Sequence, residues 1–254
     1  MMNLAGSLVI AFSMYSRIPM PQVEWTKERM KYAMCFFPLI GVVIGALVYG
    51  SFWLLSSLGF EWAAKLFPLL VPVLVTGGIH MDGFLDVVDA RASHGDKEKM
   101  LQIMKDPHTG AFAIIGCCVY FLFYAAAFGE ITPEYMAAAG GIFVMTRALS
   151  GLAVVTFPMA KNSGLAASFS GQADRRVVKY TMFFYLAAAE GFILAAAGNT
   201  AGIVVAAAAG LTYFYYYRMA KREFGGITGD LAGYFLQLCE LWMIAGLAAV
   251  AHIH

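Results

Sequence analysis

Charged side chains are scarce in this sequence of 254 residues: Asp, Glu, Lys and Arg together make up 13% of it, whereas hydrophobic residues make up 61%. Soluble domains carry about 25% charged and about 45–50% apolar residues. Charged residues this scarce cannot cover a water-exposed surface. The composition therefore favours a chain surrounded by lipid. The net charge of +1 also argues against a nucleic-acid-binding protein, because such proteins usually have a strongly basic face.

Cysteine is also rare, and its pattern carries no metal-site signature. The four cysteines, at 35, 117, 118 and 239, all lie inside apolar runs, and none has the spacing of metal ligands. This favours buried thiols that behave as small hydrophobic residues over disulfides or metal sites. The sequence also lacks a fixed-period repeat and a low-complexity linker, which predicts a single domain over residues 1–254.

Long apolar segments, by contrast, are abundant. A helix needs about 20 residues to cross the hydrocarbon core, and helices are favoured because lipid leaves no partner for unpaired backbone groups. A shorter segment, 4–15, leaves open an eighth helix or one that lies in the membrane interface. We therefore expect an all-α polytopic integral membrane protein with about seven transmembrane helices. The seven segments are 33–58, 62–81, 110–129, 135–158, 180–198, 201–217 and 231–253.

The basic residues show how these helices would be oriented. All 17 Lys and Arg residues except Lys65 and Arg147 lie in four polar segments, 16–32, 82–109, 159–179 and 218–230. With seven spans after residue 32, these four segments fall on one side of the membrane. The positive-inside rule predicts that this side is cytoplasmic.

Three aspartates, Asp82, Asp86 and Asp89, follow the second expected span. At about 100° per residue they lie within roughly 60° of one another on a helix, where their charges repel unless a cation sits among them. Carboxylate oxygens suit Mg²⁺, an ion that commonly serves phosphate substrates. The alternative is a solvated acidic turn, which the apolar residues between the acids disfavour. Glycines in the same segment predict a helix bend and a close backbone approach.

A second group of charged residues lies further along the chain. Asp230 begins the last expected helix, where its carboxylate could either cap the helix or serve the site. Glu240 and Arg147 each lie within a span, where a charge is expensive and is a candidate for function. Either the two form a buried ion pair, or Arg147 binds a phosphate. Asp106 is a candidate cap for the third helix.

These residues occur in motifs that resemble those of the cobalamin synthase family. The matching motifs are spread over nearly the full chain. One departure is Ala90, which stands where the family pattern has glycine. The most specific motifs are His80-x-Asp82-Gly-x-x-Asp86-x-x-Asp89 and Gly225-Gly226-x-Thr228-Gly229-Asp230. The accompanying segments are Arg17-Ile18-Pro19, Phe37-Pro38-Leu39-Ile40-Gly41, Met104-Lys105-Asp106, Arg147 and Glu240.

The resemblance implies an enzyme of the bacterial or archaeal inner membrane. Its members join adenosylcobinamide-GDP to α-ribazole or its 5′-phosphate, release GMP and need Mg²⁺. By this resemblance Asp82, Asp86 and Asp89 hold the metal, and Asp230 completes the metal site or acts as a base. The residues implied to contact substrate are Arg17, His80, Arg91, Lys105, Asp106, Arg147, Thr228 and Glu240.

Three other functions are weighed. The run Asp86-x-x-Asp89-Ala90-Arg91 also resembles part of the CDP-alcohol phosphotransferase signature, but the second half of that signature is missing. A cation transporter would place its acids near the membrane midplane, whereas most acids here lie at the boundary. A membrane subunit without catalysis would tolerate Asp86→Asn. Self-association is left open.

Overall fold

The structure, a computed structural model, describes residues 2–160 and 164–253, and in those residues it is built from helices. Within this part of the chain, five helices are long and apolar enough to cross a membrane, or six if a bent pair, α4 with α5, counts as one span. The protein is therefore an all-α polytopic membrane protein, as expected. The expected number of seven spans stays a prediction.

The central helix is α8 (Met136–Thr156), which packs between α3 (Phe37–Ser57), α10 (Arg175–Met219) and α11 (Gly229–Ala251). In its apolar window 83% of the residues are buried, against 22% in α7 (Ala111–Gly129), which faces outward. Glycines make this packing close: a Cβ on Gly45 of α3 would collide with the carbonyl oxygen of Gly140 of α8. Small residues at such crossings let helices in lipid approach backbone to backbone.

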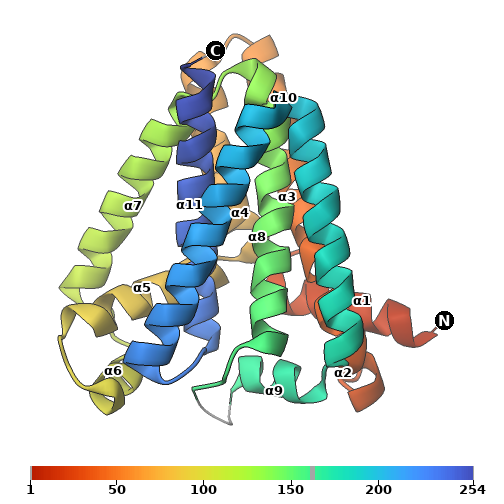
Figure 1. Ribbon diagram of the computed structural model, residues 1–254, viewed down its shortest axis with the longest axis vertical. Coiled ribbons are helices and arrows are strands. Elements are labelled where there is room, and N and C mark those ends of the chain that lie inside the picture. The colour runs from red at the N-terminus through yellow and green to blue at the C-terminus, as the bar shows by residue number, and fades with distance from the viewer. Residues whose placement is uncertain (1, 161–163, 254) are drawn as a thin grey trace.

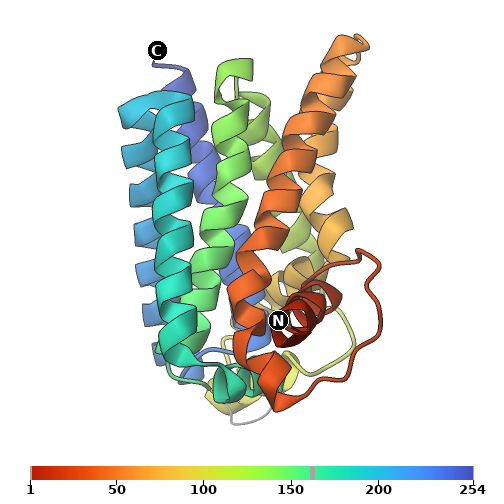
Figure 2. The same ribbon diagram turned by 90° about the vertical axis from the view of Figure 1, so that its right-hand side faces the viewer.

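The helix α10 is two helices joined at a sharp turn. Its 45 residues would extend about 67 Å as one straight helix, twice the thickness of the hydrocarbon core. Gly198 breaks it with φ 82° and ψ 174°, and the chain reverses there, so that its two halves run antiparallel (Figures 1 and 2). The two expected spans 180–198 and 201–217 correspond to these halves. Counting them as one helix is one reason why the number of helices is lower than the number of apolar segments.

The second expected span ends earlier than its hydropathy indicates. The helix α4 (Glu61–Thr76) stops at Gly77 and Gly78, whose φ angles of 64° and 82° are left-handed, and α5 (Ile79–Ala92) leaves at 94° to it. Left-handed angles are strained for residues with a side chain and free of strain for glycine. The bend expected from the glycines is confirmed. It places α5 across the end of the bundle, outside the spanning helices (Figure 1).

The short elements gather at this same end. The helix α1 (Met2–Tyr15) lies across the bundle axis, as an interfacial helix would, and its 14 residues are too few to span (Figures 1 and 2). The remaining elements are α2 (Lys27–Ala33), η1 (Met34–Phe36), α6 (Lys97–Ile103), η2 (Pro133–Tyr135), α9 (Leu165–Gln172) and the π-helical turn η3 (Ala220–Phe224). All of them except η2 lie at the end that carries α5.

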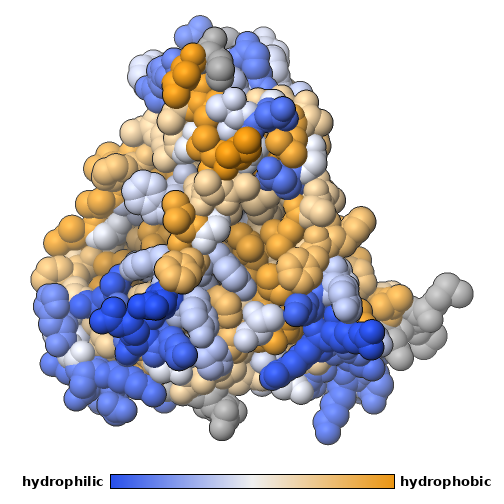
Figure 3. Space-filling view, viewed as in Figure 1, coloured by the Kyte–Doolittle hydropathy of each residue, from blue (hydrophilic) through white to orange (hydrophobic). Residues whose placement is uncertain are grey.

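Hydrophilic residues are concentrated at this end, which we call the polar end, while an apolar belt covers the middle of the molecule (Figure 3). The four basic segments of the sequence all meet here, apart from Lys161, which lies outside the described residues (Figures 1 and 2). The gathering of positive charge on one side is therefore confirmed. The four cysteines are free thiols, but only Cys239 is buried as expected, while Cys35 and Cys117 are half-buried and Cys118 is exposed on α7.

Candidate active site at the polar end

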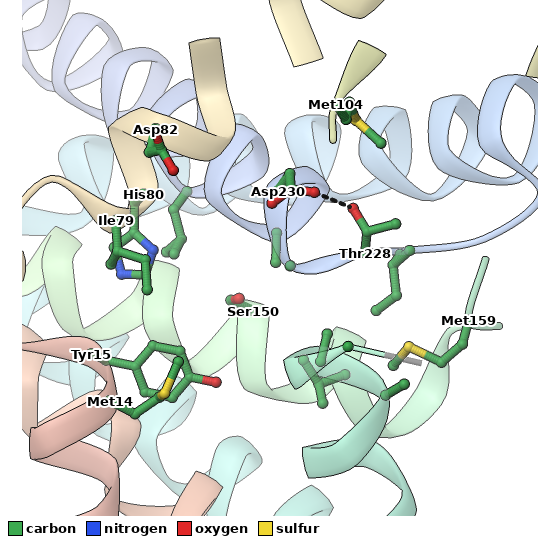
Figure 4. A pocket seen from close by; sticks show the side chains of 18 of the residues that line it. Met14, Tyr15, Ile79, His80, Asp82, Met104, Ser150, Met159, Thr228 and Asp230 are labelled. Carbon is green, nitrogen blue, oxygen red and sulfur yellow. Dashed lines mark hydrogen bonds between the residues drawn. The ribbon is translucent and has the colours of Figure 1, made fainter. Parts of the chain in front are cut away.

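A cavity of about 460 Å³ opens at the polar end, between α5, α8 and the start of α11. This volume lies within the range of about 300–1,000 Å³ found for small-molecule sites. Figure 4 shows Asp82 next to His80 on α5, with Tyr15 on the same side, and Asp230 on α11 further across the cavity. The charged side chains in its lining are Asp82, Asp230 and Lys105. The cavity thus combines acids, one amine and a largely apolar wall.

Asp82 and Asp230 are brought together because α5 and α11 cross almost in backbone contact. A Cβ on Gly83 would lie 2.7 Å from the Cα of Asp230, and a Cβ on Gly233 would lie 2.8 Å from the backbone oxygen of His80. Only glycine at these two positions permits the approach. The close approach expected for the glycines of the first motif is confirmed, and its partner is the second acidic motif.

The Gly225-Gly226-x-Thr228-Gly229-Asp230 motif shapes the entry to α11. Gly225 has a φ of 77° and ends η3, and a Cβ on Gly226 would lie 2.5 Å from the Pro158 carbonyl oxygen. Ile227 then pairs with this segment, its N–H donating to Pro158 at 2.8 Å. Thr228 is the N-cap, since its Oγ1 accepts from the N–H of Leu231 at 3.2 Å. Capping is therefore performed by Thr228, and the Asp230 carboxylate lies in the cavity lining.

The other two aspartates of α5 lie beside this cavity and are not in its lining. Burial and, to a smaller extent, the charges of Asp82, Asp230 and Asp89 together raise the pKa of Asp86 to about 6. Asp89 lies against Gly110, the residue that immediately precedes α7. A Cβ on Gly110 would collide with the carboxylate of Asp89. The dipole of α7 stabilises a negative charge at this position.

The carboxylates fit a divalent cation in their chemistry, but they are not gathered into one ligand shell. Within the described residues, no group of three or more His, Cys, Asp or Glu side chains is close enough to hold a metal ion. Asp82, Asp86 and Asp89 also have no salt bridge to a basic side chain in that part of the chain. Mg²⁺ is usually held by one or two carboxylates together with substrate phosphates. A shell of that kind fits these residues, and a cage of three aspartates alone does not.

His80 faces the aromatic side of the cavity. Its side chain is buried, and its Nε2 atom has no hydrogen-bond partner among the residues that the structure describes. Burial and the nearby guanidinium of Arg147 lower the pKa of His80 to about 3, so the imidazole is neutral at physiological pH. A neutral imidazole offers one donor and one acceptor.

Three further candidates from the sequence lie near the site in different ways. Lys105 lines the cavity. Asp106 is exposed outside the lining and binds His108 at 2.7 Å, so it does not cap α7, where Gly110 is the N-cap. Arg17 packs against the α4–α5 break: its backbone N–H donates to Val75 at 2.7 Å, and a Cβ on Gly77 would lie 2.7 Å from its side chain.

The guanidinium of Arg91 is fixed by four hydrogen bonds, and Arg91 is not among the residues that line the cavity. Its Nε and Nη2 donate to the two carboxylate oxygens of Glu223 at 2.8 and 3.2 Å. Its Nη1 donates to the hydroxyls of Tyr215 and Tyr234 at 2.8 and 3.1 Å. This paired and hydrogen-bonded guanidinium ties α5 to η3, α10 and α11. The substrate contact that the resemblance implies for Arg91 stays a prediction.

The structure decides between the two alternatives for Arg147 and Glu240. The Arg147 Nη1 atom lies 2.6 Å from the Glu240 Oε1 atom, and both side chains are 1% exposed. Neither residue lines the cavity. The ion-pair alternative is confirmed: the two charges neutralise each other inside the bundle, because an unpaired charge there would be costly. The contact of these two residues with substrate stays a prediction.

The chain matches the family model for cobalamin-5-phosphate synthase over residues 7–248. It belongs to this family. An adenosylcobinamide-GDP ribazoletransferase of Lachnoclostridium phytofermentans is 47% identical over 251 residues, which cover 98% of this chain and 95% of the relative. A relative of the same name from Clostridium perfringens strain 13 is 35% identical over 91% of this chain and 92% of its own length. No solved structure matches the chain.

Membership of the cobalamin-5-phosphate synthase family confirms the resemblance drawn from the motifs. The matches support neither a CDP-alcohol phosphotransferase nor a cation transporter. Some residues around the site had not been expected from the sequence, namely Tyr15 and Ser150 in the lining and Glu223, Tyr215 and Tyr234 around Arg91. Glu223 carried a weak signal, as an acid within a basic segment. The tyrosines carried none, because aromatic residues are common throughout such helices.

Proposed function

We propose that this protein transfers the phospho-cobinamide group of adenosylcobinamide-GDP to α-ribazole or α-ribazole 5′-phosphate, releasing GMP. Both relatives bear the name of this activity, and they match this chain over 95% and 92% of their own length. The observation that carries the proposal for this chain is the crossing of α5 and α11, which brings Asp82 and Asp230 into one cavity from positions 148 residues apart.

The reaction exchanges one phosphoryl oxygen bond for another. A ribose hydroxyl oxygen of the ribazole forms a bond to the phosphorus nearer the cobinamide. The bond from that phosphorus to the bridging oxygen breaks, and GMP leaves with that oxygen and its electron pair. The hydroxyl proton passes to a base, and the carboxylates of Asp82 and Asp230 are the groups in the lining that can take it.

Charge stabilisation supplies much of the catalysis in such transfers. Lys105 is placed to offset charge on the diphosphate, because its side chain lines the same cavity. Mg²⁺, held by Asp82 with Asp86 or Asp230 and by phosphate oxygens, would neutralise charge on the diphosphate. The protein's own acids then position the hydroxyl and the leaving nucleotide on opposite sides of the phosphorus.

We further propose that the polar end faces the cytoplasm of a cell with this protein in its inner membrane. The concentration of basic residues at that end supports the orientation through the positive-inside rule. Phosphorylated nucleotides are cytoplasmic metabolites, so the cavity would open on the side where its substrates are found.

The decisive experiment measures GMP release by the purified protein in liposomes. Adenosylcobinamide-GDP, α-ribazole 5′-phosphate and Mg²⁺ are supplied together, and each is omitted in turn. We expect Asp82→Asn and Asp86→Asn to lower the rate by roughly 100-fold or more, because each removes a negative oxygen from the reacting centre. Chelation of divalent cations should have the same effect.

The matched control is Glu98→Gln, an exposed acid of α6 at the same end and outside the cavity lining. It should keep the wild-type rate. Wild-type turnover in both aspartate variants would remove these residues from the reaction, and a protein that releases no GMP under any of these conditions would contradict the proposed activity.

A further inference from the structure

The cavity has two chemically different halves. Asp230 and Thr228 lie on one side, while Tyr15 and His80 lie on the other, with Asp82 beside His80 on α5 (Figure 4). Phe37 joins these two rings: the Tyr15 and Phe37 centroids are 4.5 Å apart, and the Phe37 and His80 centroids are 5.9 Å apart. The Tyr15 and His80 rings stack at 6.3 Å with an angle of 22° between their planes. We call Tyr15, Phe37 and His80 the ring cluster.

Within the described residues, the ring cluster contains a buried polar atom without a partner. The His80 side chain is 5% exposed and lines the cavity, and its Nε2 atom makes no hydrogen bond to any described residue. Leaving a buried polar atom unpaired is costly, so such atoms in native proteins usually meet a ligand or an ordered water. A ligand in the cavity would therefore be expected to supply a partner for this atom.

Charge excludes a phosphate from this half of the cavity. Met14, Met34 and Ile79 surround the rings, and among the lining residues the cationic side chain is Lys105. Lys105 follows Met104, which lies on the side of Asp230, away from Tyr15 (Figure 4). The nearby guanidinium of Arg147 is already paired with Glu240 at 2.6 Å, so an anion bound among the rings would be desolvated without a free counter-charge. A flat, mostly apolar group can stack there at no such cost.

We propose that the ring cluster binds the base of the ribazole substrate, with the Nε2–H of His80 donating to the ring nitrogen that is not bonded to ribose. This rests on the proposed function and assigns the two substrates to different halves of the cavity. The ribazole base is a fused, largely apolar bicycle with a single free ring nitrogen, which matches a site with a single unpaired polar atom. Guanine has several donors and acceptors on its edges, which this half would leave unpaired.

The test compares the KM values of the two substrates in one protein. We expect His80→Phe to raise the KM for α-ribazole 5′-phosphate about 10-fold, as for the loss of one hydrogen bond, and to leave the KM for adenosylcobinamide-GDP within about twofold. Tyr15→Leu should act in the same direction, while Glu98→Gln, which lies outside the cavity lining, should leave both KM values near wild type. A rise confined to the KM for adenosylcobinamide-GDP would place guanine at the rings and overturn the assignment.

A second measurement alters the substrate. An indole analogue of the ribazole, with C–H in place of the free ring nitrogen, should bind the wild-type protein about 10-fold more weakly than α-ribazole, and His80→Phe should bind both alike. Direct binding, followed by calorimetry without the GDP substrate, separates this from catalysis. Equal binding of the two compounds to the wild-type protein contradicts the subsite even if GMP is released. A protein that binds them as expected but releases no GMP contradicts the proposed function and keeps the subsite.

Discussion

Asp86 is a carboxyl group of the site whose pKa is raised by its surroundings. Burial and, to a smaller extent, the negative charges of Asp82, Asp230 and Asp89 together raise its pKa to about 6. Four carboxylates thus share one region, and no basic side chain of the described residues lies at salt-bridge distance from the three on α5. Such an excess of negative charge favours either a proton or a cation.

This shift predicts how stability depends on pH. In metal-free protein the folded state keeps a proton on Asp86 between pH 3.8 and about 6, while the unfolded chain has released it. The stabilisation is therefore complete below the unfolded pKa and is lost as the pH rises through the folded one. We expect the unfolding midpoint of the wild type to fall over this window relative to that of Asp86→Asn, measured by thermal denaturation in detergent.

Mg²⁺ should compete with the proton at the same place. At pH 7.5 the ion should raise the unfolding midpoint of the wild type more than that of Asp86→Asn, because a ligand that binds only the folded state stabilises it. Parallel pH profiles for the two proteins would show that Asp86 does not titrate in this way.

At the scale of elements, the crossing of α5 and α11 holds the two acidic motifs together. Gly83→Ala would place a Cβ 2.7 Å from the Asp230 Cα, and backbone atoms cannot move aside as a side chain can. We expect a loss of about 1–3 kcal/mol of stability and a marked loss of GMP release, because the helices must separate. The control is Gly210→Ala in α10, where no atom lies within 4 Å and the change should be neutral or stabilising. Equal effects of the two substitutions would mean that the crossing tolerates a side chain.

The ion pair of Arg147 with Glu240 joins α8 to α11 inside the bundle. Glu240→Gln leaves the Arg147 charge without its partner, which should destabilise the protein by about 3–5 kcal/mol. The double variant Arg147→Met/Glu240→Leu removes both charges and should recover much of that loss, as measured by thermal unfolding in detergent. If the double variant is stable but releases no GMP, the pair has a role in substrate binding after all.

At the scale of the whole molecule, the separation of polar and apolar surfaces defines a membrane orientation. Asn199 lies at the turn between the two halves of α10, and Glu98 lies on α6 at the opposite, polar end. We expect Asn199→Cys to react with a membrane-impermeant maleimide in intact cells and Glu98→Cys to react only after permeabilisation. The unsubstituted protein is the control, and its four cysteines should stay unlabelled. The reverse pattern would place the cavity on the outer side.

Much of this arrangement could be predicted from the sequence, and the misses have physical causes. The bend at Gly77 and Gly78 was predictable because glycine tolerates left-handed angles. The pairing of Arg91 with Glu223 was not, because the direction of a guanidinium depends on neighbours that are distant in sequence. The same holds for Asp89, which helical periodicity grouped with Asp82 but which lies against the start of α7.

The sequence by itself determined the membrane class, the gathering of basic residues at one end and the family, because lipid imposes length and composition on every span and the motifs are local. Only the tertiary structure decided which acids share the cavity, which charges neutralise each other, and that Tyr15 and Phe37 meet His80. Those outcomes depend on how closely distant helices cross. The distance of that approach is decided by glycines on both partners together, and neither helix carries that information alone.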